Sequence, residues 1–130
     1  MVMGSNTFFS LPINKRPLPG KHRRSIVITF DPEATKFDAY RRTENLQIMD
    51  LHTFRSAYSA EDRATMFFIG GADLYRVLLP EIRELHLTQL NGDYQCDTFV
   101  RVDWASPNSS WDVAHHETHE DHTYTILTKK

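Results

Sequence analysis

The stretch from Phe67 to Tyr75 constrains the fold of this chain more than any other feature. The apolar run Phe67-Phe68-Ile69 has the composition of a strand, and the segment from Ala72 onward repeats apolar residues at helical spacing. Gly70 and Gly71 stand between the two patterns. Paired glycines at such a turn let the backbone approach a ligand, and the helix start behind them offers N–H groups to a phosphate. The same dipeptide also serves as a plain tight turn, so both interpretations stay open.

Strand and helix patterns alternate along the chain. Alternation of this kind predicts an α/β sheet with right-handed crossovers, in one domain that covers residues 1–130. The predicted helices cover residues 7–11, the segment that Asp50 caps, and residues 72–79, whereas residues 31–45 are predicted to be mainly loop. The predicted strands cover residues 25–30, 46–49, 65–69 and 84–90, followed by a terminal hairpin of residues 111–117 and 123–128.

Composition excludes few functions, but it indicates which partners and which compartment to expect. The net charge of −2 gives no reason to expect nucleic acid or a membrane as a partner. The single Cys96 excludes an internal disulfide and favours a reducing compartment, so we expect a cytoplasmic protein. The sequence holds no apolar run long enough to cross a bilayer, and its beginning has no signal-peptide pattern.

Four motifs together resemble dihydrofolate reductase in their order and approximate spacing. The resemblance runs from Met1 to Lys130, and it implies reduction of 7,8-dihydrofolate to tetrahydrofolate with NADPH, in one-carbon metabolism. It also implies a mixed, mainly parallel sheet flanked by helices, with a C-terminal antiparallel hairpin, and binding of antifolates. The motifs are Met3–Pro12, Arg16–Gly20 with the strand that follows it, Ile69-Gly70-Gly71 and Leu85–Thr88.

The resemblance also implies which residues hold the cofactor. In the family the glycine pair faces the cofactor and is typically joined by a cis peptide. Family members commonly place Arg or Lys at the position of Ser5 to pair with the 2′-phosphate of NADPH, and Phe30 departs from the pattern in the same way. We still expect NADPH, with Lys36 or Arg24 as the substitute cation. The implied cofactor residues are Ser5, Asn6, Thr7, Thr29, Gly70, Gly71, Ala72, Asp73, Leu74 and Tyr75.

The substrate side is implied in the same way. Apolar side chains would clasp the pterin and benzoyl rings, and an Arg would grip the glutamate carboxylate through a bidentate pair. Counting back from the strand selects Arg23 for that anchor, whereas counting forward from Gly20 selects Lys21; strand register favours Arg23. The implied substrate residues are Leu11, Lys15, Arg16, Leu18, Arg23, Ile69 and Thr88.

No catalytic residue is assigned. In the family, the Thr at position 88 hydrogen-bonds an active-site carboxylate that lies in the N-terminal segment, and no Asp or Glu of this sequence matches it. That segment also supplies the central first strand and the mobile loop, so we expect a truncated domain that turns over dihydrofolate slowly. The strands at residues 65–69 and 84–90 would then expose edges that invite a partner chain or self-association. The alternative function is a non-catalytic module of the same fold, completed by a partner.

A group of histidines near the C-terminus requires a separate interpretation. His115, His116, His119 and His122 stand among acidic residues such as Glu117, and imidazoles with carboxylates are ligands for Zn²⁺. On a strand–loop–strand interpretation we expect these side chains to diverge. The prediction is therefore that the chain has no metal site.

Overall fold

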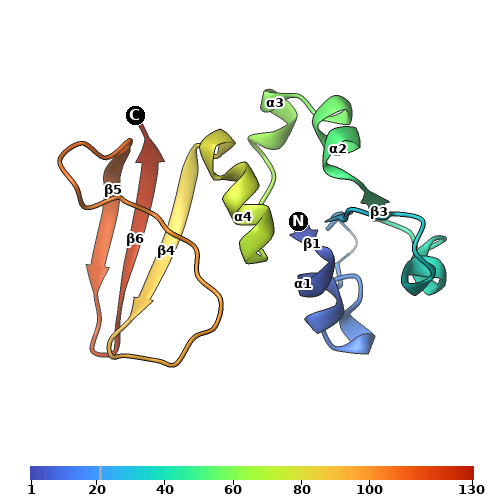
Figure 1. Cartoon of the computed structure of the whole chain (residues 1–130), viewed down its shortest axis with the longest axis horizontal. Coiled ribbons are helices and arrows are strands. Elements are labelled where there is room, and N and C mark those ends of the chain that lie inside the picture. Colours follow the sequence, from blue (N-terminus) through green and yellow to red (C-terminus); the bar gives the residue numbers. More distant parts are fainter. Residues whose placement is uncertain (21) are drawn as a thin grey trace. The chain divides into compact units, whose positions relative to one another are not determined.

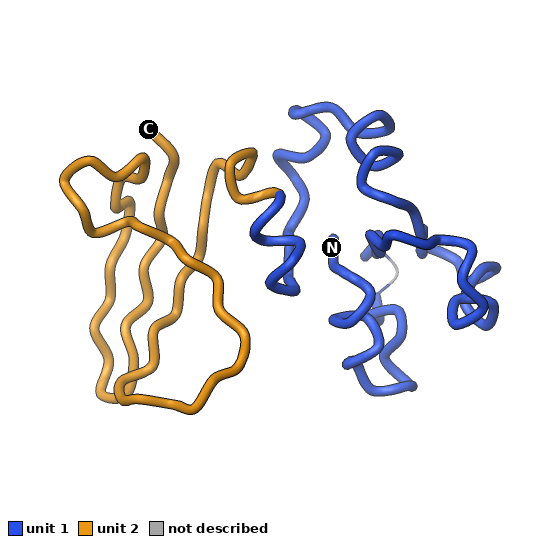
Figure 2. The backbone as a smooth tube through the Cα atoms, in the orientation of Figure 1, with its two compact units in different colours: residues 1–77 blue, residues 78–130 orange. Residues whose placement is uncertain are grey.

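The computed structural model describes residues 1–20 and 22–130 (Figure 1). It divides into two compact units, residues 1–77 and residues 78–130, shown in blue and orange in Figure 2. Each unit is built around its own small sheet, one parallel and one antiparallel. The predicted mixed α/β architecture is confirmed.

The parallel sheet of the first unit contains β1 (Val2–Gly4), β2 (Ser25–Ile28) and β3 (Leu46–Met49), in that order. Strand β2 is buried along its whole length, as expected of the apolar, β-branched run Ile26-Val27-Ile28 in the middle of a parallel sheet. Its register places Val2 beside Ile26 and Gly4 beside Ile28. All strands of this sheet therefore end at one carboxyl edge.

The strand predicted at residues 65–69 is shorter than expected. Only a single parallel bridge between Val2 and Phe68 forms, supported by bonds from the Val2 nitrogen to the Phe67 oxygen (2.7 Å) and from the Ile69 nitrogen to the Val2 oxygen (2.9 Å). Since β1 has only three residues, it offers too little length for a longer ladder. The segment still extends the sheet and ends at the same edge as β1.

Helices connect these strands. The Oδ1 atom of Asp50 accepts a bond from the Thr53 nitrogen at 2.7 Å, so the predicted cap is confirmed. The segment predicted to be mainly loop contains a 3₁₀ helix, and Pro80 lies in another that follows α4. The helices are α1 (Ser5–Ser10), α2 (Leu51–Ala57), α3 (Ala60–Arg63) and α4 (Ala72–Leu78), and the 3₁₀ helices are η1 (Ile13–Lys15), η2 (Thr35–Tyr40) and η3 (Leu79–Glu81).

The second unit is an antiparallel sheet of β4 (Glu84–Leu90), β5 (Trp111–Thr118) and β6 (His122–Lys129), in the order β4-β6-β5. The predicted terminal hairpin is β5 with β6, and it is confirmed. One face of the sheet carries the buried Leu127 and Thr125, so this face is the apolar one. The opposite face mixes polar side chains, such as those of His86 and His115, with the apolar Ile126.

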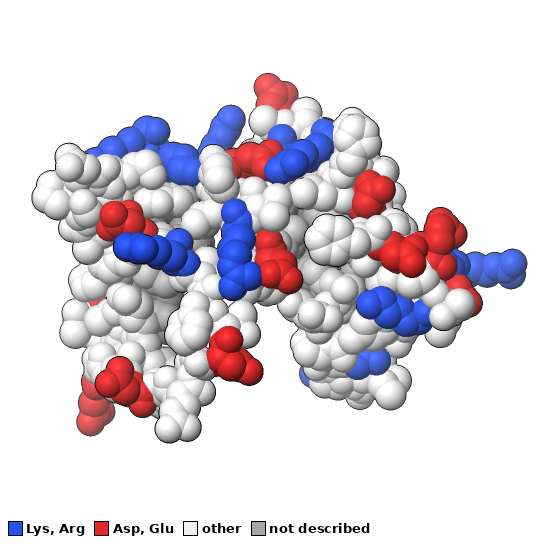
Figure 3. Space-filling model, in the orientation of Figure 1, with Lys and Arg blue, Asp and Glu red and all other residues white. Residues whose placement is uncertain are grey.

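Charged side chains of both signs are interspersed on the face of the molecule drawn in Figure 3. This distribution agrees with the small net charge. Among the described residues, no helix has the length and apolar character needed to cross a membrane.

Candidate functional site

The candidate site lies where β1 and the 67–69 segment end. The Gly4 nitrogen donates to the Gly70 oxygen at 2.7 Å, which brings the start of α1 beside the glycine pair. The peptide bond between Gly70 and Gly71 is cis, as expected. Two strand-to-helix turns, one into α1 and one into α4, thus meet at the carboxyl edge of the sheet. In open α/β sheets, this edge is where ligands bind.

Thr7 lies close against the glycine pair. A Cβ atom added at Gly70 or at Gly71 would lie 3.3 Å from the Thr7 hydroxyl oxygen, closer than side-chain atoms usually come. Gly70 also has φ of +121°, a conformation that other residues rarely adopt. The backbone here therefore stays bare, and Thr7 presents its hydroxyl beside it.

Tyr75 closes one side of this turn. Its nitrogen donates to the Gly71 oxygen at 3.0 Å, and its hydroxyl donates to the Phe68 oxygen at 3.4 Å. The ring is half-buried, and burial raises the pKa of the phenol, so Tyr75 stays neutral at ordinary pH. The structure thus brings Tyr75, Thr7 and the glycine pair together, four positions predicted to hold a cofactor.

The other predicted cofactor positions differ in how they are placed. Ser5 and Asn6 lie in the first turn of α1, where helix N–H groups have no partner within the helix. Leu74 is buried and packs inward, and Asp73 pairs with Arg76 at 2.7 Å. Ala72 is the first residue of α4.

Thr29 follows β2 at the same edge of the sheet, and its nitrogen donates to the Met49 oxygen at 3.0 Å. The next side chain, Phe30, is fully exposed. Arg24 and Lys36 were expected to replace the cation that family members commonly place at position 5, but both lie elsewhere. Arg24 stands before β2, at the opposite edge, and the Lys36 nitrogen lies 5.6 Å from the centre of the Phe9 ring.

Three of the predicted substrate residues pack against the same core cluster. Leu11, Leu18 and Ile69 are half-buried and all pack against the core of the first unit. That core consists of the buried side chains of Met3, Phe8, Val27 and Phe37. Lys15, another predicted substrate residue, is exposed and lies in η1.

Arg16 has a role that sequence reasoning missed. Its guanidinium donates to the Leu11 oxygen at 2.7 Å and to the Phe9 oxygen, and it lies 3.4 Å from the Tyr40 hydroxyl. It therefore satisfies carbonyl groups at the C-terminal end of α1. A helix followed within a few residues by a cation was the signal for this role.

Arg23 stands before β2, at the amino edge of the parallel sheet. Arg23 lines an open cavity of about 1120 Å³ at the amino edge of the parallel sheet, together with Arg24, Met66 and Phe67. Lys21, the alternative anchor, lies outside the described residues. Thr88 belongs to the second unit, where it is exposed and stands opposite Tyr124 in the register.

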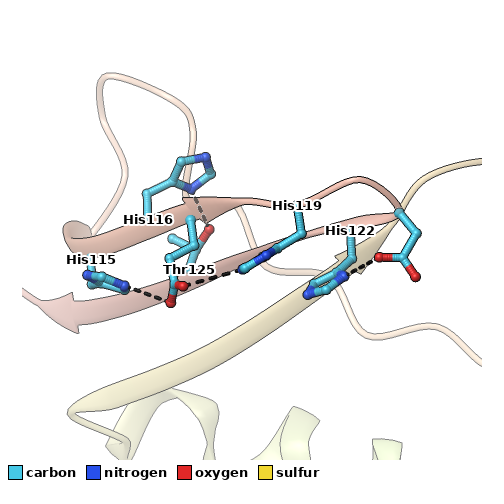
Figure 4. A network of polar contacts seen from close by, with 7 residues as sticks. His115, His116, His119, His122 and Thr125 are labelled. Atoms are coloured by element: carbon cyan, nitrogen blue, oxygen red, sulfur yellow. Dashed lines mark hydrogen bonds and ion pairs between the residues drawn. The ribbon is translucent and has the colours of Figure 1, made fainter.

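The histidines do not all diverge, so that prediction is wrong. His115 Nε2 lies 2.8 Å from one oxygen of Glu117, and His119 Nε2 lies 3.3 Å from the other (Figure 4). The His119 and His122 rings stack with centres 4.5 Å apart, because a tight turn joins β5 to β6. His116 alone turns to the other face and bonds Thr125 at 2.9 Å.

This histidine network has an electrostatic effect. The hydrogen bond from His115 is the main reason that the pKa of the Glu117 carboxyl lies below its usual value. A bond from His122 lowers the pKa of Asp121 in the same way. Within residues 1–20 and 22–130, no group of three or more such side chains is arranged to hold a metal ion.

Gly4 is the second feature that sequence reasoning missed. It shapes the site because its backbone bonds Gly70, and a Cβ added to it would lie 3.6 Å from the Gly71 nitrogen. The sequence did signal it, since Gly4 stands between a strand and a helix just as Gly70 does.

Three known proteins illustrate what the sequence of this chain is similar to. A dihydrofolate reductase of Aedes albopictus is 27% identical over 108 residues, which cover 76% of this chain and 53% of the relative. Bifunctional dihydrofolate reductase-thymidylate synthase 1 of Arabidopsis thaliana is 33% identical over 123 residues, 85% of this chain and 22% of the relative. A dihydrofolate reductase of Staphylococcus aureus is 26% identical over 134 residues, 100% of this chain and 74% of the relative.

The chain thus spans about half, or less, of the length of the first two relatives. The sequence model of the family described as "Dihydrofolate reductase" matches residues 1–129, nearly the whole chain. The chain therefore belongs to the dihydrofolate reductase family.

Proposed function

We propose that this chain carries the nucleotide-binding part of an enzyme that reduces 7,8-dihydrofolate to tetrahydrofolate with NADPH, in the cytoplasm. The bare backbone of Gly70 and Gly71 beside the Thr7 hydroxyl carries this proposal, since a flat cofactor ring can approach peptide groups that no side chain covers. Membership of the family supports the reaction. The single Cys96, which is free, supports a reducing compartment.

The residues around the glycine pair suit the nicotinamide end of the cofactor and its bridging phosphates. Gly70, Gly71 and Tyr75 would hold the nicotinamide end, while Thr7 and the first-turn N–H groups of Ser5 and Asn6 would contact the phosphates. NADPH supplies the hydride in this chemistry. The protein's task is to fix the ring against the acceptor and to exclude water.

The 2′-phosphate end fits less well. Ser5 and Phe30 are uncharged, Arg24 stands at the other edge of the sheet, and Lys36 lies over aromatic rings. We therefore propose that NADPH binds with only a small preference over NADH, because a cation on this phosphate contributes much of that preference.

On the substrate side, Leu11, Leu18 and Ile69 would form the apolar wall for the pterin. Arg23 remains our proposed anchor for the glutamate carboxylate, with Thr88 as the partner of an acid that this sequence does not supply. Without that acid, we expect the 130-residue chain by itself to bind ligands but to turn over dihydrofolate far below ordinary enzyme rates of about 1–10³ s⁻¹.

The test is a fluorescence titration of the purified chain with NADPH and with NADH, followed by a dihydrofolate turnover assay. Saturable binding of NADPH with little turnover is the expected result. The control is Gly92→Ala, which places a side chain at another positive φ, of +108°, far from these turns in the sequence, and leaves nucleotide affinity unchanged. Absence of binding to either nucleotide contradicts the proposal.

One observation favours a second function, a non-catalytic module completed by a partner chain. Strand β4 stands at the edge of its sheet, and its exposed residues offer a place for such a partner. Nucleotide binding distinguishes the two proposals, because a module kept only for its fold has no reason to retain a bare glycine pair beside Thr7.

A further inference from the structure

Asn91 and Gly92 begin the segment that joins β4 to β5, and they place a free backbone nitrogen beside a labile side chain. Within residues 1–20 and 22–130, the Gly92 nitrogen donates no hydrogen bond. A Cβ added at Gly92 would have only one atom within 4 Å, a ring carbon of Tyr94 at 3.8 Å, so nothing shields this nitrogen. Asparagine is one of the chemically labile residues of proteins, and Asn91 is exposed.

Asn108 offers a comparison within the same chain, because it is also exposed and followed by a small residue. There the following nitrogen, that of Ser109, donates to the Ser106 oxygen at 3.0 Å. A nitrogen held in this bond is not free to react with the side chain before it. The remaining asparagines are followed by residues larger than glycine or serine, and they are Asn6, Asn14 and Asn45.

We propose that Asn91 is a modification site, at which water converts the side-chain amide to a carboxylate by deamidation through a cyclic imide. The Gly92 nitrogen forms a bond to Cγ of Asn91, and the bond from Cγ to Nδ2 breaks. Ammonia leaves with the proton that the Gly92 nitrogen loses. Water then opens the five-membered ring at either of its two carbonyl carbons, which yields aspartate or isoaspartate. An amide and water thus become a carboxylic acid and ammonia, without an oxidant, a reductant or a cofactor.

One hydrogen bond of the Asn91 side chain opposes this reaction. Its Nδ2 atom donates to the Glu120 oxygen at 3.2 Å, in a bond that is exposed to solvent. Because water replaces such a bond when it opens, holding the amide there slows the reaction by about tenfold or less. The folded chain should therefore react at Asn91 almost as fast as the unfolded chain.

The product changes the junction between β4 and the β5–β6 turn, which lie side by side in Figure 1. Two bonds join them at Asn91, one from its nitrogen to the Asp121 oxygen at 2.9 Å and one from Nδ2 to the Glu120 oxygen. Both products lack the Nδ2 hydrogens, so the second bond is lost. Both also add a negative charge beside a turn that already carries two carboxylates, and like charges repel. Deamidation therefore loosens the start of the segment 91–110.

Peptide mass mapping of the incubated 130-residue chain tests the site. Trypsin separates Asn91 from Asn108, because Arg101 lies between them, and a deamidated peptide gains the mass that replaces NH₂ by OH. The rate at each asparagine is measured in the folded chain and in guanidinium chloride. Folding should slow Asn91 by about tenfold or less, and it should slow Asn108 more than Asn91. The proposal is overturned if folding slows Asn91 beyond that range, or if it slows Asn108 no more than Asn91.

Two aspartate variants test the effect of the product, with amide hydrogen exchange as the readout. Asn91→Asp reproduces one product, and Asn108→Asp makes the same change of charge elsewhere as the matched control. After correction for the intrinsic rates, the amide of residue 91 should exchange at least about threefold faster in Asn91→Asp and unchanged in Asn108→Asp. Circular dichroism shows whether both variants keep their sheets.

Asn91→Gln removes the reaction but keeps an amide, since its longer side chain would have to close a six-membered ring, which forms far more slowly. The acidic species that ion-exchange chromatography separates from the incubated chain should therefore disappear in this variant. No nucleotide or substrate enters these measurements, so their outcome is independent of the proposed enzymatic function. Equal exchange at residue 91 in the unmodified chain and in Asn91→Asp overturns the loosening, and acidic species that persist in Asn91→Gln overturn the site.

Discussion

The Gly4 nitrogen lies 2.7 Å from the Gly70 oxygen and donates to it, although half of the chain separates the two residues in the sequence. Each residue ends an extended segment and stands before a helix, α1 or α4. The bond therefore fixes two turns at one edge of the parallel sheet. Together with the bonds between Val2 and the 67–69 segment, this bond holds the two segments side by side, and Thr7 of α1 lies against the glycine pair.

Adding a methyl group to the glycine pair should weaken nucleotide binding. In Gly71→Ala, the new Cβ meets the Thr7 hydroxyl oxygen at 3.3 Å and covers the bare peptide. We expect at least a tenfold loss of NADPH affinity in a fluorescence titration. Gly70→Ala should in addition lower the free energy of unfolding by about 1–3 kcal/mol, because φ is +121° there. Unchanged affinity in both variants contradicts the assignment of this turn.

Arg16 should matter for stability. Arg16→Met removes the bonds to the Leu11 and Phe9 oxygens and leaves carbonyl groups of α1 unsatisfied. We expect the free energy of unfolding to fall by about 1–3 kcal/mol in urea denaturation. The matched control is Arg42→Met at an exposed position, with an expected change within about 0.5 kcal/mol. Equal losses in the two variants show that the guanidinium does not cap the helix.

A cation at position 5 should restore preference for NADPH. In Ser5→Arg, a guanidinium in the first turn of α1 gains a charge-assisted bond to the 2′-phosphate, which NADH lacks. We expect NADPH affinity to rise about tenfold while NADH affinity stays the same. Ser5→Gln, a polar side chain without charge, is the control. A parallel gain for both nucleotides indicates non-specific attraction instead.

The histidine network should be visible in a pH titration. The folded-state pKa of Glu117 is lowered mainly by the bond from His115, so its stabilising effect is present above the ordinary carboxyl pKa. That effect is lost as the pH falls through the folded-state value. Carboxyl NMR shifts should show Glu117 titrating below its usual range, and His115→Ala should raise its pKa. His116→Ala, which alters the other face, should leave it unchanged.

The sequence predicts the elements of this fold better than their lengths. The cap at Asp50 and the β5–β6 hairpin are local features, set by neighbouring residues, and both were predicted correctly. The strand at residues 65–69 was predicted too long, because its length depends on how much of β1 is available to pair with it. A local sequence pattern does not show which distant segments pair with each other, or over what length.

The candidate site shows the same limit. The glycine pair was found from its position between a strand and a helix, but the bond to Gly4 and the contact with Thr7 required the sheet register. The histidines were expected to diverge because a strand alternates its side chains. The turn at Glu120-Asp121 instead brings His119 and His122 into a stack, a contact between strands that no single-strand pattern reveals.

Backbone amide NMR of the 130-residue chain, recorded while NADPH is added, tests the central claim most directly. The claim predicts that the amides of Gly4, Thr7, Gly70 and Gly71 shift together and saturate at one dissociation constant, and that Gly71→Ala weakens all four responses. Shifts confined to other residues, such as Arg23 and Arg24 of the cavity at the opposite edge, would place the nucleotide elsewhere and contradict the claim.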